Sequence, residues 1–139
     1  MKWATTLVLT ISAITTGIEG SAHTHTNSRT LVRAIHLVET GGRTGPIMGD
    51  NGAAMGPLQI HRACWIDANI SGKYEDVADL SYAKRVFAAY MARYATVRRL
   101  GRPVTNQDRA RIWNGGPNGY KRNSTLGYWA KVKEQMNGR

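Results

Sequence analysis

The sequence lacks the means to form a disulfide bond within the chain, because Cys64 is its single cysteine. A lone thiol also excludes a zinc site of the Cys-x-x-Cys type. No group of His, Cys, Asp and Glu stands at metal-binding spacing, so we expect no metal and no cofactor. The sequence therefore predicts one small domain that is held together by packing.

Acidic residues are also scarce, since nine Asp and Glu stand against nineteen Lys and Arg. The resulting net charge of +10 indicates an anionic partner, which can be a bacterial envelope polymer, a membrane surface or a nucleic acid. The basic residues are scattered, and residues 98–102, RRLGR, form the one dense cluster. No nucleic-acid recognition motif accompanies them. We therefore expect an anionic cell-wall surface as the partner, and no nucleic acid.

The N-terminal apolar run is short, and its surroundings are typical of an export signal. Lys2 precedes the uncharged residues 3–18, and small residues follow near Ala22. A comfortable membrane span needs about 20 apolar residues, whereas a basic start, a short apolar run and a small-residue exit favour a signal peptide. We predict a signal peptide over residues 1–22, a single domain over residues 23–139, and a secreted or periplasmic location. An uncleaved N-terminal anchor is the alternative.

Beyond a polar leader at residues 23–28, hydrophobic periodicity predicts a mostly helical domain. Ser28 is a plausible N-cap for the first helix, and Gly41 and Gly42 would end it. Thr105 and Asp108 fit the pattern of a capping box. The predicted helices span residues 28–40, 58–69, 76–98, 105–113 and 124–136.

A Gly-rich insert follows the first predicted helix. Residues 43–58 contain six Gly or Pro, which favours turns and short strands over a helix. The stretch Asp50-Asn51-Gly52 is a strong turn signal. We therefore predict a small irregular β hairpin around it, and an α+β fold class overall.

Two carboxylates flank this insert in unlike settings. Glu39 ends an apolar helix, and Asp50 lies in the tight turn. Cleavage of a glycosidic bond needs a protonated acid beside the leaving oxygen and a carboxylate near the anomeric carbon. An apolar setting would raise the pKa of Glu39, and a polar turn would leave Asp50 solvated. The pair also has a plainer explanation, since a helix-terminal Glu and a turn Asp are common in proteins.

Four stretches of the chain resemble the invertebrate-type, destabilase-like lysozymes. They are VETGG at 38–42, GDNGAAMGPLQIHRACWIDA at 49–68, YMARYAT at 90–96 and ARIWNGGPNGYKRNSTLGYWAKV at 110–132. The match spans residues 35–133 in unbroken order. Each stretch is weak alone, but the shared placement of Trp, Gln and Gly-Gly-Pro makes the combination specific.

The resemblance implies a lysozyme-like fold and hydrolysis of the β-1,4 link between N-acetylmuramic acid and N-acetylglucosamine. It implies that Glu39 and Asp50 are the catalytic acids, and that peptidoglycan glycan strands are the substrate of a monomeric enzyme. It places Tyr128 and Trp129 in the core. The implied saccharide-binding residues are Gln59, Ile60, Trp113, Asn114, Gly115, Gly116 and Pro117; for Trp113, core packing is the alternative.

The chain also departs from the family pattern. The family is rich in disulfides, whereas this chain has residues such as Met55, Ala68 and Tyr120 at the cysteine positions. The segment from Asp50 to the Gly-Pro pair is about one residue shorter. Three alternatives stay open: a lytic transglycosylase with Glu39 as its sole acid, a non-catalytic cell-wall-binding module, and a basic protein that binds nucleic acid or membranes.

Overall fold

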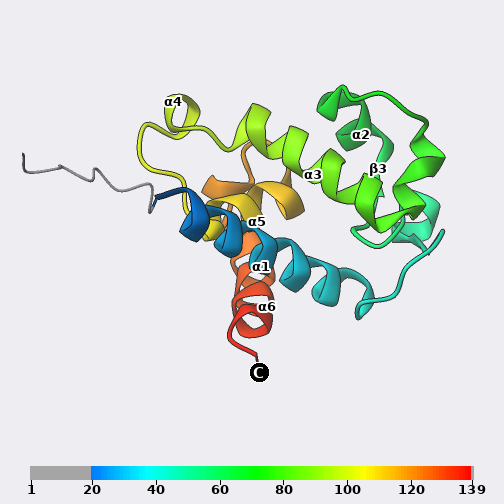
Figure 1. Cartoon of the computed structure of the whole chain (residues 1–139), viewed down its shortest axis with the longest axis horizontal. Coiled ribbons are helices and arrows are strands. Elements are labelled where there is room, and N and C mark those ends of the chain that lie inside the picture. Colours follow the sequence, from blue (N-terminus) through cyan, green and yellow to red (C-terminus); the bar gives the residue numbers. More distant parts are fainter. Residues whose placement is uncertain (1–19, 139) are drawn as a thin grey trace, which may run out of the picture.

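The computed structural model describes residues 20–138, which form α-helices, short 3₁₀ turns and one small sheet (Figure 1). The helices are α1 (Gly20–Thr40), α2 (Arg62–Ala68), α3 (Leu80–Tyr94), α4 (Val97–Leu100), α5 (Asn106–Gly115) and α6 (Leu126–Met136). The strands are β1 (Met48–Gly49), β2 (Ala54–Met55) and β3 (Ile60–His61). No helix in this described part of the chain is long and apolar enough to cross a membrane.

The first helix begins earlier than its periodicity predicts. It starts at Gly20, so the prediction of a polar leader capped at Ser28 is wrong. Apolar periodicity marks the buried stretch alone, where Leu31 and Ile35 are fully buried. Once that stretch is anchored, each further residue adds one hydrogen bond to an existing helix, which needs no apolar face. Residues 1–19, most of the predicted signal peptide, lie outside the described residues.

The predicted hairpin is confirmed, and a third strand extends it. Strand β1 pairs antiparallel with β2, and β2 pairs antiparallel with β3. The turn between β1 and β2 holds Asp50, Asn51 and Gly52 at φ values of 50°, 53° and 88°, a left-handed conformation that Asn, Asp and Gly tolerate best. The start of the helix predicted over 58–69 is wrong, because residues 58–59 lie in a turn, in which Gln59 has φ of 50°, and residues 60–61 form β3 before α2 begins.

The long helix predicted over residues 76–98 is divided into three parts by two capping residues. Asp79 accepts a hydrogen bond from the Tyr82 amide at 2.7 Å, and α3 begins there after a 3₁₀ turn at Tyr74–Ala78. Thr96 accepts one from the Arg99 amide at 3.2 Å and begins α4. A side chain that bonds the backbone in this way favours a helix start over a helix interior.

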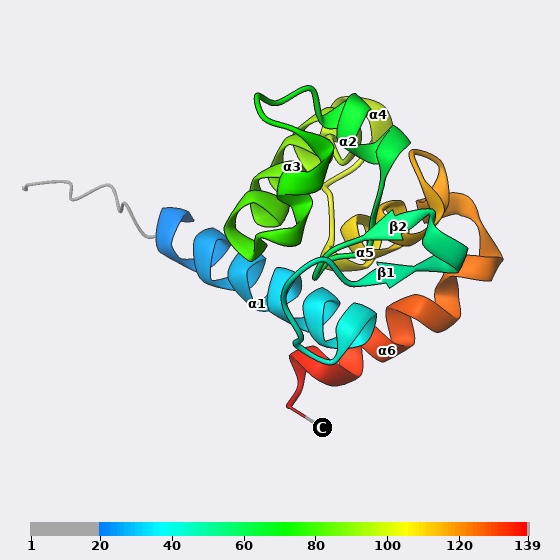
Figure 2. The ribbon, with the colours of Figure 1, turned by 90° about the vertical axis from the view of Figure 1, so that its right-hand side faces the viewer.

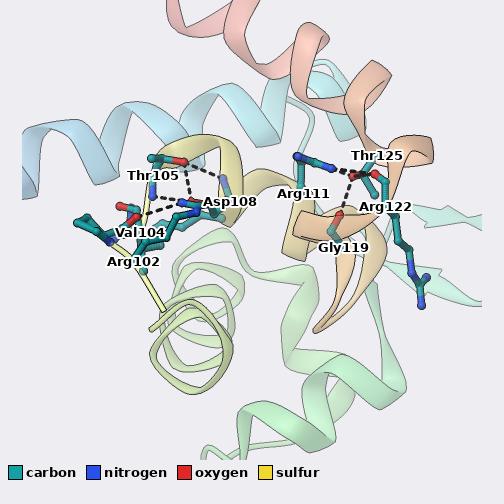
Figure 3. Close-up of polar contacts among 10 residues, drawn as sticks. Arg102, Val104, Thr105, Asp108, Arg111, Gly119, Arg122 and Thr125 are labelled. Carbon is teal, nitrogen blue, oxygen red and sulfur yellow. Dashed lines mark hydrogen bonds and ion pairs between the residues drawn. The ribbon is translucent and has the colours of Figure 1, made fainter. Parts of the chain in front are cut away.

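The capping box at the start of α5 is confirmed (Figure 3). The Thr105 hydroxyl accepts from the Asp108 amide at 3.2 Å, and the Asp108 carboxylate accepts from the Thr105 amide at 2.9 Å. Arg102 adds two charged hydrogen bonds at 2.7 and 2.8 Å. Burial by itself raises the pKa of Asp108, but the bonds from Arg102 and Thr105 outweigh it and lower that pKa to about 2. The start of α5 is therefore held by an ionised, fully paired carboxylate.

A second polar cluster fixes the turn between α5 and α6 (Figure 3). The Arg111 guanidinium donates to the Thr125 hydroxyl at 2.9 Å and to the Arg122 carbonyl at 2.9 Å. The Thr125 hydroxyl in turn lies 2.8 Å from the Gly119 carbonyl. A Cβ at Gly119 would collide with the Arg111 carbonyl, so glycine is required at this close approach. This cluster sets where α6 begins.

Packing takes the place of the disulfides that the resemblance implies. The positions where the resemblance places cysteines lie in the core or against it: Ala68 is buried, and Met55 and Tyr120 pack on the core. Helix α1 crosses and packs against α6, and the hairpin lies beside them (Figure 2). The last turn of α1 therefore meets both the hairpin and the first turns of α6.

Candidate active site

Glu39 lies in the last turn of α1, where the helix reaches α6. Its side chain is half-buried, and the Tyr128 hydroxyl donates a hydrogen bond of 2.6 Å to its Oε1 atom. Tyr128 comes from the first turn of α6, whose start is set by the Arg111–Thr125 cluster. The carboxyl group is thus held by a residue 89 positions away in the sequence.

Two opposing effects set the acidity of Glu39. Burial raises its pKa because the charged form loses solvation, and the hydrogen bond from Tyr128 lowers it by stabilising the carboxylate. Burial is the larger effect, so the pKa of Glu39 is raised. Burial, with the adjacent Glu39 charge and hydrogen bond, also raises the pKa of Tyr128 well above its usual value, so Tyr128 acts as a donor. The arrangement favours a carboxyl group that retains its proton to a higher pH than a solvated glutamate.

Asp50 has the opposite environment. It lies at the first position of the hairpin turn, and its side chain is 65% exposed. Its Oδ2 atom lies 3.3 Å from Nε2 of His61, whose side chain is 50% exposed. Asp50 thus faces solvent and an imidazole, whereas Glu39 is half-buried beside Tyr128. The two acids therefore differ in the way that acid-catalysed glycoside cleavage requires.

Glu39 and Asp50 line one pocket of about 240 Å³. Its wall holds seven residues: Glu39, Asp50, Ala54, Gln59, His61, Trp113 and Asn114. The pocket therefore brings together both predicted acids and three of the predicted saccharide-binding residues. Their roles remain predictions that rest on this shared location.

Ile60 differs from its expectation, because strand alternation turns it inward. Neighbouring side chains in an extended strand point to opposite sides, so within β3 His61 lines the pocket while Ile60 enters the core with 1% of its surface exposed. Gln59 lines the pocket from the turn that precedes β3. His61 was not predicted as a site residue. The alternation around Ile60 is the signal that could have identified it.

Gln59 braces the hairpin as well as lining the pocket. Its side-chain amide donates to the Ile47 carbonyl at 3.1 Å and to the Gly56 carbonyl at 2.9 Å. A Cβ at Gly49 would collide with the Gln59 side-chain oxygen, so Gly49 allows the amide to lie flat against β1. Gln59 holds the chain on both sides of Asp50 and thus positions that carboxylate.

Trp113 combines its two predicted roles. Its ring packs on Phe87 with centroids 5.0 Å apart and meets Tyr90 edge-on at 6.0 Å, and it also lines the pocket next to Asn114. The predicted residues Gly115, Gly116 and Pro117 are not among those that line the pocket in the described chain. They form the turn that ends α5, where Gly115 packs closely against Thr125 and Gly116 has φ of 77°.

Comparisons with known proteins agree with this architecture. No family model matches the chain. The chain is 40% identical over 119 residues to Lysozyme 1 of Crassostrea virginica; the aligned region covers 84% of this chain and 64% of that protein. It therefore spans less than two thirds of the length of that relative. It is 36% identical over 110 residues to the lysozyme of Meretrix lusoria; the aligned region covers 77% of this chain and 88% of that protein.

A third relative and a solved structure extend the match. The chain is 36% identical over 81 residues to the invertebrate-type lysozyme of Ruditapes philippinarum, covering 57% of this chain and 58% of that protein. The crystal structure of Meretrix lusoria lysozyme in complex with PliI from Aeromonas hydrophila matches with a TM-score of 0.67 and 34% identity, over 76% of this chain and 88% of that one. The lysozyme-like fold is thereby confirmed, and the chain belongs to the invertebrate-type lysozyme family.

Proposed function

We propose that the chain is an exported muramidase that hydrolyses the β-1,4 bond between N-acetylmuramic acid and N-acetylglucosamine in peptidoglycan. One observation carries this proposal: a half-buried glutamate with a raised pKa shares a small pocket with an exposed aspartate. That pairing supplies the acid and the carboxylate that glycoside cleavage needs. The proposal includes a signal peptide over residues 1–22 and a monomeric catalytic domain over residues 23–139.

In this mechanism, Glu39 donates its proton to the glycosidic oxygen as the bond to the anomeric carbon breaks. Positive charge develops on the sugar ring, and the Asp50 carboxylate stabilises or attacks that centre. After the first product leaves, the deprotonated Glu39 takes a proton from the incoming water, whose oxygen bonds to the anomeric carbon and displaces the Asp50 carboxylate where that has attacked. Tyr128 bonds the carboxylate form of Glu39 and so stabilises it between the two steps.

The wall of the pocket supplies the contacts for the sugar. Asn114 is exposed and polar, and Gln59 is partly exposed, so their amides can bond the N-acetyl groups and hydroxyls of the glycan. The net charge of +10 would hold the enzyme on an anionic cell wall. Secretion or a periplasmic location, and an antimicrobial role, follow from this substrate.

The mass of the products tests the reaction directly. Purified peptidoglycan sacculi are incubated with the chain, and the released fragments are measured by mass spectrometry. Hydrolysis adds one water to each cleaved bond, so we expect fragments with reducing N-acetylmuramic acid ends. Anhydro-muramic ends would contradict hydrolysis and indicate a lytic transglycosylase. Binding to sacculi without released fragments would contradict both and indicate a binding module.

Tyr128→Phe tests how the pKa of Glu39 is set. The variant loses the hydrogen bond that lowers this pKa, so the acid retains its proton to a higher pH. We expect the alkaline limb of the kcat/KM profile to move to higher pH, with a decrease of about tenfold in kcat and a smaller change in KM. Trp129→Phe is the control, because it alters the neighbouring aromatic residue without removing the bond. An unchanged alkaline limb in Tyr128→Phe would contradict this role.

A further inference from the structure

A second pocket lies apart from the acid pair, at the junction of α3 and α4. It has a volume of about 510 Å³ and is lined by Arg93, Thr96, Arg98 and Arg99. Three of its four lining residues thus carry a guanidinium group. The pocket contains the start of the dense basic cluster that the sequence shows at residues 98–102.

Two of these arginines are held in place on the ring of Tyr94. The Arg93 and Arg99 guanidinium carbons each lie 5.4 Å from the ring centroid. Arg93 also donates to the Asp67 carbonyl at 3.1 Å. Guanidinium groups that are ordered in this way lose less side-chain entropy when they bind a ligand.

The positive charge of this pocket is not neutralised within the described residues. In residues 20–138, no ion pair joins a carboxylate to Arg93, Arg98 or Arg99. The nearby carboxylate is that of Asp67, and it accepts a hydrogen bond of 2.9 Å from the Tyr94 hydroxyl. Three like charges around one hollow repel each other unless an anion separates them. The pocket is therefore electrostatically suited to an anionic ligand.

Arg98 is the lining arginine with its donors available. It is exposed, and within the described chain its side chain makes no hydrogen bond or ion pair. The fork of five N–H donors on a guanidinium matches the oxygens of a phosphate group. The volume of this pocket is larger than a single phosphate group needs, and it falls in the usual range for small-molecule sites, about 300–1,000 Å³.

The arginine pocket is connected to the candidate active site by the segment that follows α5. Arg99 donates to the Asn118 side chain at 2.9 Å and to the Pro117 carbonyl at 3.3 Å. Asn114, the second-to-last residue of α5 and just before that segment, lines the pocket of the acid pair. If the bacterial cell wall carries an anionic polymer as well as the glycan, that anion could therefore bind in the arginine pocket, close to the glycan strand that is being cleaved.

We propose that Arg93, Arg98 and Arg99 form a phosphodiester-binding site for a polyol-phosphate polymer of the bacterial cell wall. The site holds the enzyme on a wall that carries this polymer while the acid pair acts on the glycan. The choice of a wall polymer rests on the proposed muramidase function. Phosphodiester recognition itself rests on the arginine pocket.

Calorimetric titration of the full chain with poly(glycerol phosphate) tests the site. We expect saturable binding that weakens with salt, and an affinity about tenfold lower in Arg98→Gln. Arg122→Gln is the matched control, because it removes the same charge from an exposed side chain that points away from its neighbours (Figure 3). An equal loss in both variants, or no binding by the unmodified chain, would overturn the proposal, since either result leaves only diffuse charge.

Parallel titrations separate the sources of a phosphodiester. Phosphatidylglycerol vesicles and duplex DNA are titrated at matched phosphate concentration. Tighter, Arg98-dependent binding to either of them would overturn the assignment to a wall polymer. Clearing of polymer-free sacculi by the unmodified chain reports the muramidase function separately, because that substrate carries no phosphodiester. We expect faster clearing when the sacculi retain the polymer.

Discussion

We expect Glu39→Gln to abolish the clearing of bacterial cell-wall suspensions. Glutamine has no acidic proton to donate, and loss of a general acid reduces the rate about 100- to 10,000-fold. We expect a decrease of at least about 1,000-fold in kcat/KM, because burial suits Glu39 specifically to this step. The measurement is the rate of turbidity loss. The control is Glu134→Gln, the same change at an exposed position on α6. Full activity in Glu39→Gln would assign the acid role to another residue.

The stability of Glu39→Gln shows whether lost activity reflects lost folding. Burial raises the pKa of Glu39 in the folded chain above its unfolded value. As pH rises through the interval between these two values, the unfolded chain releases the proton first, so the free energy of unfolding falls. Glutamine removes this pH-dependent loss and can still accept the bond from Tyr128. The variant should therefore unfold at an equal or higher temperature at pH 7, with the difference disappearing below about pH 4.

We expect Asp50→Asn to produce the second large effect. The substitution keeps the shape of the side chain and its place in the hairpin turn, because Asn tolerates positive φ as well as Asp does. It removes the charge that would stabilise the developing oxocarbenium centre. Loss of such a preorganised electrostatic contact lowers kcat by about 100- to 1,000-fold. Turbidity assays at saturating substrate measure this, and Asp76→Asn at an exposed helix start is the control.

The result for Asp50→Asn also distinguishes two mechanisms. A full rate in this variant would contradict a nucleophilic or stabilising role, and a transglycosylase with Glu39 as its sole acid would then account for the activity. His61 provides an internal comparison, because its Nε2 atom lies 3.3 Å from the Asp50 carboxylate. The effect of replacing His61 should be smaller than that of Asp50→Asn, since the charge of Asp50 itself remains.

Local signals in the sequence were sufficient for several elements of the fold. The Thr105–Asp108 capping box requires two side chains and two amides within four residues, so its pattern is complete in the sequence. The turn at residues 50–52 is equally local, because Asp, Asn and Gly each tolerate the left-handed conformation. The last predicted helix, 124–136, agrees with α6 (Leu126–Met136) within two residues for the same reason: its apolar periodicity reports its buried face.

The features that the sequence did not provide depend on contacts between distant segments. Tyr128 was expected in the core, and its ring does lie on the packed side of α6. Nothing in the periodicity of α6 indicates that the hydroxyl group reaches Glu39, because that contact depends on how α6 packs against α1. Ile60 entered the predicted site through its family pattern, whereas its inward direction depends on β3 pairing with β2. The arginine pocket likewise joins α3 and α4, and Arg99 connects it to the turn beyond α5.

The single thiol has a consequence for how this protein can be handled and produced. Burial, followed by the nearby charge of Asp67, raises the pKa of Cys64 to about 12, so almost none of it is thiolate at neutral pH. Thiolate is the form that reacts with peroxide and exchanges with glutathione. Cys64 should therefore resist both reactions. Because it has no second cysteine in the chain to pair with, recombinant chain made in a reducing cytosol would need no oxidative refolding, and dithiothreitol in its storage buffer would leave its fold unchanged.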